Sequence, residues 1–342
     1  MKSLKIRTVP LLYRKYSAVK VVDASGKAHY FTTLADALTV AGDTTITVRN
    51  DMVLSDTLVL DTDANITLDL SGKTISGNIG TLLKLTSGNI TIKNGTIRNV
   101  HEAATETKYS IYMAGDAVAK IEDVTIETTG IGIYMDGNAH ITELNADISS
   151  YITVSGYCTF DAVSMVGNAK IDLISDGTYK TYFAESMFEA KLAGQSMSYN
   201  QCYTINLNSA NAYIGEIRGG TFIGAMDTAN NGTPIHVNNG TVNLISGGYF
   251  GFAEKSFSDA IYMLFANTSN GGAINKITGG TFEKGAKPVD NPRYTGYGCD
   301  FENIVAASGC KVKLTGETVV RGNQLSSKVK ETTLEVVRVV PQ

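Results

Sequence analysis

The sequence predicts an all-β protein in which short strands stack on one another as a solenoid. First, SIYMAGDAVAKIEDVTI at residues 110–126 recurs as GIYMDGNAHITELNADI at residues 132–148, with the Tyr, the Met and the closing Ile in register. Second, the pattern I-x-x-I-x-G-G-T-F appears at residues 214–222, 242–250 and 274–282, with a weaker copy at 171–179. Third, a charged share of only 18% with 34 glycines is typical of short strands and tight turns. A repeating unit of this kind buries its apolar face on the next copy.

Residues 1–31 are expected to form a basic arm and a hairpin, which would serve as an anchor. No carboxylate precedes Asp23, and the basic residues before it are Lys2, Lys5, Arg7, Arg14, Lys15 and Lys20. Such a segment is either a solvated tail or an arm that docks on an acidic partner. The hairpin is predicted at residues 19–31, around the turn at 24–26. The apolar run at residues 9–13 is shorter than the roughly 7–15 residues of a secretory signal, so we expect no signal peptide.

A short helix is predicted over residues 32–42. Thr32 or Thr33 can cap its first turn, Gly42 can end it, and one apolar face is formed by Leu34, Ala37, Leu38 and Ala41. A helix placed before the first coil would cover the open end of a stack of strands.

Residues 32–317 are predicted to form the solenoid. Segments beginning at Ile46, Ile66 and Ile90 alternate apolar and polar residues and are taken as equivalent strands. Repeats of roughly 20–32 residues are too short for crossover helices, so equivalent strands must stack in parallel. Dividing the length by about 24 residues gives roughly 11–12 coils. Longer repeats place loops on one face, which we expect at residues 180–201, 253–260 and 284–300. Residues 318–342 read as a C-terminal strand segment that packs on the last coil or on a neighbouring chain.

These repeats resemble the right-handed parallel β-helix of the pectate-lyase-like superfamily. The resemblance rests on the I-x-x-I-x-G-G-T-F pattern and on ITLDLSGKTISG after a capping helix, and it covers about residues 32–317. Members include polysaccharide lyases and hydrolases, surface adhesins, and bacteriophage tailspikes and fibres. The order of basic arm, β-helix and strand-rich end is similar to the phage group. That resemblance implies a homotrimer fixed to the virion by its N-terminus.

Two tyrosines are the candidate ligand-binding residues. If the Ile and Met of each I-Y-M motif point inward, Tyr112 and Tyr134 point outward, one coil apart. Lys84 would continue this column, and Tyr262 repeats the motif further along the chain. An outward aromatic ladder can stack on sugar rings, form a subunit interface, or stabilise the coil by stacking on itself. The absence of Trp removes the strongest residue for stacking on sugars.

The carboxylates give no convincing catalytic site. Hydrolysis of glycans needs two carboxylates about 5–9.5 Å apart. Across adjacent coils the candidates are Asp116 with Asp136, and Glu122 or Asp123 with Glu143. Asp beside Gly in a turn is usually there for its backbone geometry. A lyase site would need a basic residue beside acidic ligands, and Arg218 has only Glu216 near it in sequence. We therefore predict no catalytic residue, although the enzymatic alternative stays open.

The sequence predicts neither a metal site nor a cofactor. The cysteines lack CxxC spacing and the histidines are dispersed, at Cys158, Cys202, Cys299 and Cys310 and at His29, His101, His140 and His236. The cysteines read as buried small hydrophobes, with a bridge between Cys299 and Cys310 left open. Four Asn residues that match glycosylation sequons read as turn and ladder residues: Asn65, Asn89, Asn94 and Asn239.

The sequence favours a non-enzymatic structural and attachment protein. We expect a homotrimeric β-helical fibre or spike of a phage virion, made in the bacterial cytoplasm, docked by the basic arm and able to bind host surface glycan. The alternatives are a β-helical polysaccharide depolymerase, either a lyase or a glycoside hydrolase, and an adhesin of the bacterial cell surface. A net charge of −4 argues against nucleic-acid binding. No run approaches the roughly 20 apolar residues of a membrane span.

Overall fold

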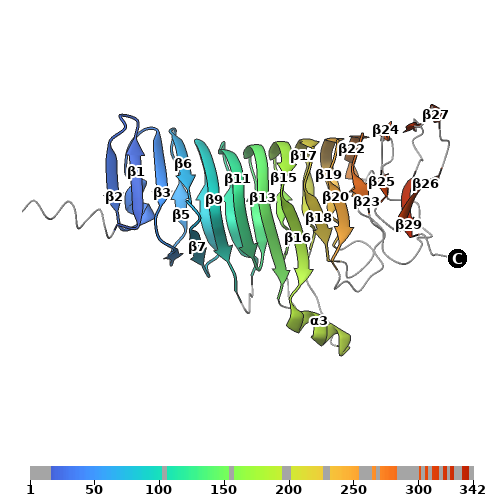
Figure 1. The fold of residues 1–342 in the computed structure, drawn as a ribbon, viewed down its shortest axis with the longest axis horizontal. Coiled ribbons are helices and arrows are strands. Elements are labelled where there is room, and N and C mark those ends of the chain that lie inside the picture. The colour runs from blue at the N-terminus through green and yellow to red at the C-terminus, as the bar shows by residue number, and fades with distance from the viewer. Residues whose placement is uncertain are drawn as a thin grey trace, which may run out of the picture.

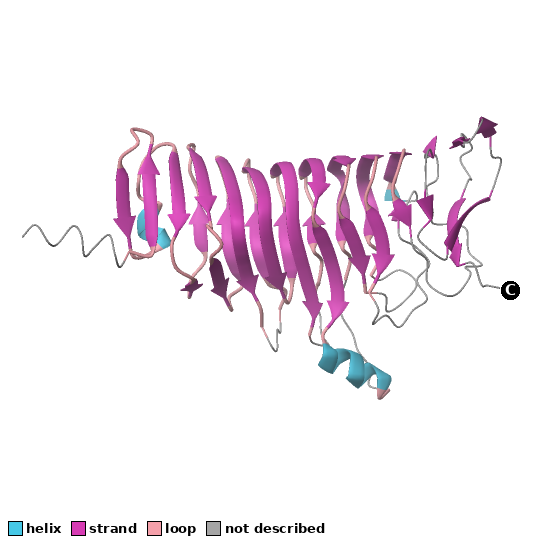
Figure 2. Cartoon of the chain, in the orientation of Figure 1, coloured by secondary structure: helices cyan, strands magenta, loops and turns pink. Residues whose placement is uncertain are grey.

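One long sheet dominates the molecule. The computed structural model describes residues 17–101, 106–153, 158–194, 202–225, 232–253, 264–266, 270–282, 300–301, 305–306, 310–315, 319–321, 324–326 and 333–338. These residues form an all-β fold whose main sheet is rich in parallel pairs and is not closed into a barrel. After the first hairpin, the strands advance along the long axis toward the C-terminal end (Figures 1 and 2). The predicted fold class is confirmed at this level.

The N-terminal end begins with an antiparallel hairpin. β1 (Val19–Asp23) pairs antiparallel with β2 (Ala28–Phe31) and also with β3 (Thr44–Val48). The predicted hairpin is confirmed, and through β1 it belongs to the same sheet as the stacked strands. Grouping it with the basic arm, with a boundary at residue 31, therefore separates two strands that are hydrogen-bonded. Residues 1–16, which hold most of the basic arm, lie outside the described residues.

The predicted capping helix is a single turn, α2 (Leu34–Ala37). Thr33 is its N-cap, and its hydroxyl accepts a hydrogen bond from the Asp36 backbone N–H at 3.1 Å. The Leu34 and Ala37 side chains are buried against the core, as predicted, whereas Ala41 of the predicted apolar face is exposed. The helix is shorter than the expected span of 32–42.

Above this cap the strands form three rows, which we call A, B and C. Row A holds ten strand segments: β3, β6 (Asn65–Asp69), the start of β9 (Asn89–Asn99), of β11 (Val118–Thr128) and of β13 (His140–Ile152), β15 (Lys170–Asp176), the end of β17 (Ile205–Ile217) and of β19 (Ile235–Ile245), β22 (Gly272–Ile277) and β24 (Asp300–Phe301). Every neighbouring pair in this row is parallel, as predicted.

Rows B and C repeat this arrangement. Row B also holds ten segments: β4 (Met52–Leu54), β7 (Thr74–Gly77), the ends of β9, β11 and β13, β16 (Thr178–Phe183), β18 (Thr221–Gly224), β20 (Tyr249–Phe252), β23 (Thr281–Phe282) and β25 (Val305–Ala306). Row C holds eight: β5 (Leu58–Leu60), β8 (Thr81–Leu85), β10 (Tyr109–Met113), β12 (Ile131–Met135), β14 (Val163–Met165), the starts of β17 and β19, and β21 (Leu264–Ala266). One pass of the chain through A, B and C is called a winding below.

The described residues contain ten windings in rows A and B, against the 11–12 predicted. The number is lower because the later windings contain more residues than the predicted repeat of about 24. Hydrogen-bonded Asp and Asn residues at the turns between rows C and A are 22, 30 and 43 residues apart in successive windings, so later windings use more chain than the assumed repeat.

The register matches the sequence repeats, with one correction. Ile111 pairs with Ile133 and Met113 with Met135, as the first repeat predicted. At the start of the stack, however, Ile66 pairs with Thr44 and not with Ile46. A shift of two residues keeps the same side chains inward, because the side-chain period of a strand is two. Alternation alone therefore could not fix this register.

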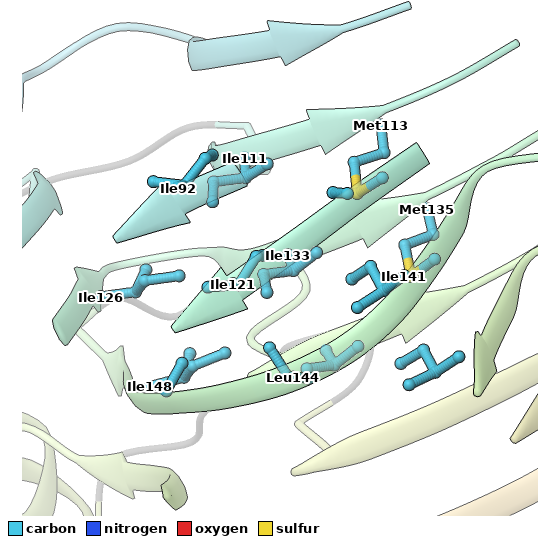
Figure 3. Close-up of a cluster of buried hydrophobic side chains, with 14 of the residues drawn as sticks. Ile92, Ile111, Met113, Ile121, Ile126, Ile133, Met135, Ile141, Leu144 and Ile148 are labelled. Atoms are coloured by element: carbon cyan, nitrogen blue, oxygen red, sulfur yellow. The ribbon is translucent and has the colours of Figure 1, made fainter. Parts of the chain in front are cut away.

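The inward side chains form one continuous hydrophobic core. Figure 3 shows the side chains of both copies of the I-Y-M repeat meeting those of row A and row B strands. Ile111, Met113, Ile133 and Met135 have no exposed surface. Each such side chain contributes about 1.5–3 kcal/mol by leaving water. Further along, the rings of Tyr179, Phe222 and Phe250 stack inside the core with centroids 4.9 and 5.0 Å apart.

One corner, between rows B and C, holds the long excursions. The shortest connection there is the two residues 129–130, whereas residues 184–204 separate β16 from β17. The latter excursion contains α3 (Glu185–Leu192), which projects from the stack (Figure 1), and it begins after β16 rather than at residue 180. Beneath it lies a second apolar cluster: Ile152, Cys158, Phe160, Phe183, Met187, Cys202 and Ala225. The excursions predicted at 253–260 and 284–300 lie almost entirely outside the described residues.

The C-terminal end changes strand arrangement. The last parallel partners in the described chain are β24 and β25. β26 (Cys310–Thr315) pairs antiparallel with β29 (Thr333–Arg338), and β27 (Val319–Arg321) pairs antiparallel with β28 (Gln324–Ser326). Residues 310–315, which lie within the range predicted for the solenoid, thus belong to an antiparallel pair. β27, β28 and β29 lie within residues 318–342.

Candidate functional site

Three tyrosines form an aromatic surface on the outside of row C, called the tyrosine surface below. Tyr112 and Tyr134 are register partners, as predicted, and their ring centroids are 5.1 Å apart. Tyr109, at the start of β10, joins them at 5.4 Å from Tyr112 and 5.1 Å from Tyr134. All three are partly exposed, while their neighbours Ile111, Met113, Ile133 and Met135 are buried. The surface therefore presents ring area to solvent on a rigid strand row.

Charged groups lie at two edges of the tyrosine surface. Lys84 is the register partner of Tyr112, as predicted, and its ammonium lies 5.7 Å from the Tyr112 ring centroid. This is within range of a cation–π contact. Burial and the nearby Asp136 carboxylate raise the pKa of Tyr134 to about 12, and the same two causes raise the pKa of Tyr112. The hydroxyls thus stay protonated at neutral pH and can donate hydrogen bonds.

Two excursions contact each other at the B–C corner, close in sequence to Tyr109. The Thr159 backbone N–H donates to the Thr107 hydroxyl at 3.1 Å, although 52 residues separate them. This bond draws the excursion after β13 back toward the residues that precede Tyr109. Lys108, beside Thr107, pairs with Glu106 at 2.7 Å. The contact between Thr107 and Thr159 therefore joins two windings at this corner.

Beyond Tyr134 the same outward column becomes a buried polar network. Its next register partners are Ser164, Asn206 and His236. Asn206 donates from Nδ2 to Asp161 at 3.0 Å, and its Oδ1 accepts from His236 Nδ1 at 2.9 Å. The Asp161 carboxylate also accepts from the Tyr203 backbone N–H at 2.8 Å. One hydrogen-bonded chain thus links three successive windings.

The ionisable groups of this network have displaced pKa values. Burial raises the pKa of Asp161 to about 6, against the hydrogen bonds that it accepts from Tyr203, Asn206 and Ser164. Burial lowers the pKa of His236 to about 3. The His236 ring stacks on Tyr203 at 3.8 Å, almost parallel. Asp161, Tyr203 and Asn206 lie outside every repeat, so no sequence pattern marks them as site residues.

The candidate carboxylates are engaged in turns and ladders. Asp116 accepts from Asn138 Nδ2 at 2.7 Å, and Asp136 accepts from the Gly137 N–H at 2.6 Å. Lys120 bridges Glu122 and Glu143, at 2.6 and 3.1 Å. Asp123 accepts from Asn145 at 3.0 Å. These contacts favour the structural interpretation of each residue.

Three of the basic and metal-ligating candidates each pair with one carboxylate. Arg218 pairs with Glu216 at 2.8 Å, and Glu216 accepts from Ser246. His29 lies 2.8 Å from Asp23, and His140 lies 2.7 Å from Asp172. Among the described residues, no group of three or more His, Cys, Asp or Glu is placed to hold a metal ion.

The remaining sequence candidates have structural roles where they are described. Cys158 and Cys202 are buried, as predicted. Cys299 lies outside the described residues. Asn65 and Asn94 donate to Asp43 and Asp69, and Asn239 accepts from the Gly240 N–H, as expected of turn and ladder residues. Tyr262 lies outside the described residues.

Comparison of the chain with protein-family models, curated protein sequences and solved structures finds no match in any of the three. In the part of the chain that the structure describes, no helix has the length and apolar character to cross a membrane.

Proposed function

We propose that this chain is a right-handed parallel β-helix that acts as a non-enzymatic structural and attachment protein, and that its tyrosine surface binds carbohydrate. The observation behind the proposal is the cluster of Tyr109, Tyr112 and Tyr134 on the outside of row C, beside the one corner where excursions emerge. Inserted loops of a solenoid often form its binding face. Tyrosine offers both a flat apolar ring and a hydroxyl donor to a sugar.

A non-enzymatic role is supported by the contacts of the carboxylates. Acid–base cleavage of a glycosidic bond needs one carboxylate free to protonate the leaving group and another to act as base or nucleophile. Glu122 and Glu143 instead share the Lys120 ammonium, and Asp116 and Asp136 hold turns. Asp161 has a raised pKa, but it is fully buried and its carboxylate holds three partners.

The layout of the chain supports a proposal about its location and assembly. A β-helix between a basic N-terminal arm and a strand-rich C-terminal segment resembles the fibres and tailspikes of bacteriophages. We infer a homotrimer docked to a phage virion by the arm, with the tyrosine surface directed at host surface glycan.

A carbohydrate-binding array tests the proposal. Purified full-length protein is applied to bacterial capsular and lipopolysaccharide-derived polysaccharides. We expect at least one to bind, and replacing both Tyr112 and Tyr134 by Ala to weaken that binding roughly tenfold or more, since about 1.4 kcal/mol corresponds to a factor of ten. The double Phe variant keeps the rings and is expected to retain most of the affinity. Tyr151→Ala, an outward tyrosine of row B, is the matched control and should bind like the wild type.

The same samples separate attachment from enzymatic cleavage. Incubation of the bound polysaccharide with the protein should release neither new reducing ends nor unsaturated products. Appearance of either product would establish the depolymerase alternative. Binding that is unchanged in the double Ala variant would remove the tyrosine surface from the account.

A further inference from the structure

The first winding has two strand edges that no described strand covers. In row A the outer side of β3 is covered by β1, which pairs with it antiparallel. β4 and β5 begin rows B and C, and in the described part of the chain each has one strand partner, β7 for β4 and β8 for β5. Natural proteins usually cover such edges, because their unpaired N–H and C=O groups invite a further strand. The first winding therefore has room for one more strand beside β4 and β5.

These two edge strands also expose apolar side chains. Val53 of β4 and Val59 of β5 are 81% and 46% exposed. Among the described residues they are two of the three exposed large apolar side chains, and the third is Leu192 of α3. Side chains of neighbouring strands stabilise a sheet by packing on each other. A strand beside β4 and β5 would therefore cover apolar surface as well as backbone groups.

The same winding is acidic. Residues 50–72 contain no Lys or Arg and five aspartates: Asp51, Asp56, Asp61, Asp63 and Asp69. The first four are exposed, and among the described residues none of the five has an ion pair. Asp51 accepts from the Thr74 N–H at 2.9 Å and Asp61 from the Ser87 hydroxyl at 2.8 Å, both neutral donors. The strand that best fits this edge is therefore basic.

The N-terminal end of the described chain is directed toward this edge. The antiparallel ladder of β1 and β3 ends with Val19 beside Val48. Beyond it, the Arg49 N–H donates to the Ala18 carbonyl at 2.8 Å. The Arg49 guanidinium donates to the Ser17 carbonyl and hydroxyl, at 3.1 and 2.6 Å. The ladder thus extends past β1 toward the corner at which the chain enters β4, and a ladder continued in this direction leads along β4 and then β5.

We propose that residues 7–16 of this chain dock on the first winding as an antiparallel edge strand beside β4 and β5. Continuing the register of β1 and β3 puts Lys15 beside Met52 and Arg14 beside Val53, between Asp51 and Asp56 in sequence. Ten extended residues span about 33 Å, which suffices for the nine residues from β4 to β5. The inference concerns the free protein and does not rest on the proposed carbohydrate binding.

The composition of the docking segment fits this edge. It has no acidic residue and three basic ones, Arg7, Arg14 and Lys15. Most of its other side chains are apolar or aromatic: Val9, Pro10, Leu11, Leu12, Tyr13 and Tyr16. A proline is tolerated here because an edge strand can leave its outer N–H positions unpaired. The acidic surface that the basic arm was predicted to dock on is thus present in the same chain.

Zero-length cross-linking of the full-length wild type tests the contact. A carbodiimide joins a lysine amine to a carboxylate only where the two groups touch. After digestion, mass spectrometry should find Lys15 coupled to Asp51 or Asp56. Unlabelled and heavy-nitrogen-labelled protein are refolded together from urea before the reaction, and the coupled peptides should always carry the same label. Mixed labels would overturn the proposal by assigning the edge to the arm of a neighbouring copy, and absence of any coupling between Lys15 and residues 51–63 would overturn it outright.

Hydrogen exchange gives a second readout of the same contact. Replacing both Arg14 and Lys15 by Glu puts like charges beside the aspartates, so the backbone amides of residues 52–60 should exchange roughly tenfold faster or more than in the wild type. The matched control replaces Lys2 and Lys5 by Glu, which changes the net charge equally outside the docking segment and should leave this exchange unchanged. Equal exchange in the two double variants would contradict the docking of residues 7–16. Neither measurement involves a saccharide, so the failure of carbohydrate binding and the failure of this inference are distinguishable.

Discussion

At the residue scale, Asp161 and His236 belong to one hydrogen-bonded chain, but burial displaces their pKa values in opposite directions. The raised pKa of Asp161, about 6 against 3.8, gives stability that is present below pH 4 and is lost as the pH rises through 6. The lowered pKa of His236, about 3 against 6.5, gives stability that is present above pH 6.5 and is lost as the pH falls toward 3. Between about pH 4 and pH 6 the changes of the two contributions with pH cancel, so their sum stays nearly constant.

Replacing His236 by Gln exposes one of these contributions. The Gln side chain can still donate a hydrogen bond to Asn206, but it does not titrate. As the pH is lowered from 6 to 4, the wild type loses the His236 contribution and the variant does not. The free energy of unfolding of His236→Gln relative to the wild type should therefore rise by about 1.4 kcal/mol for each unit by which the pH falls. Urea denaturation at pH 4, 5, 6 and 7 measures this difference. The lost stacking on Tyr203 adds an offset that does not depend on pH, so parallel profiles would contradict the assigned pKa values.

At the element scale, each Gly-Gly pair of the repeat serves two purposes. The second glycine has a left-handed backbone, with φ of +97° at Gly220 and +100° at Gly248, which other residues rarely adopt. The first glycine allows close stacking of windings, because a Cβ at Gly247 would overlap the Arg218 carbonyl oxygen of the winding before. The GG motif is therefore required by the spacing between strands.

A single methyl group at this position tests the stacking. Gly247→Ala should destabilise the protein by about 2 kcal/mol or more, because two backbones must separate. Gly80→Ala is the matched control, since a Cβ there meets no atom within 4 Å. Thermal unfolding followed by circular dichroism compares the two variants. Equal melting temperatures would show that the windings are not packed as closely as described.

The repeated strands could be predicted from the sequence, whereas the contacts of the excursions could not. The register of Ile111, Tyr112 and Met113 on their partners could be predicted, because identical residues recur at each strand of a parallel row. The buried network around Asp161 and Tyr203 could not be predicted. Both residues lie in excursions of unique sequence, and their partners belong to other windings. Tyr109 was missed for a similar reason, since only the fold shows that its ring turns toward Tyr134.

At the scale of the whole molecule, the stack explains why insertions gather at one corner. The turns between rows C and A are held by a ladder of side chains, Asp116, Asn138, Asn168 and Asn211, with bonds of 2.7–2.8 Å. Stacked glycines occupy the same turns, and a Cβ at Gly167 would crowd the Gly137 backbone nitrogen at 2.8 Å. Extra residues there would break both contacts. The B–C corner lacks this ladder among the described residues, so chain can be added there without disturbing the rows.

The inferred assembly gives a prediction about mass. A homotrimer should elute with about three times the 36.5 kDa of one chain when its mass is measured by light scattering after gel filtration. The measured mass should stay the same in moderate salt, since an extended interface between the three chains buries apolar as well as charged surface. A mass of one chain at micromolar concentration would contradict the trimer, without affecting the fold.

The parallel stacking of windings underlies every proposal above, and distances between spin labels test it most directly. The four cysteines are replaced by Ala, one label is placed at Thr45 in the first winding, and the second at Glu143, Glu216 or Lys276, all in row A. Pulsed electron paramagnetic resonance should give distances near 19, 29 and 38 Å, because these positions lie about four, six and eight strand spacings of 4.8 Å from Thr45. Distances that do not increase in this order, or that stay below about 25 Å for Lys276, would contradict the stack and with it the tyrosine surface.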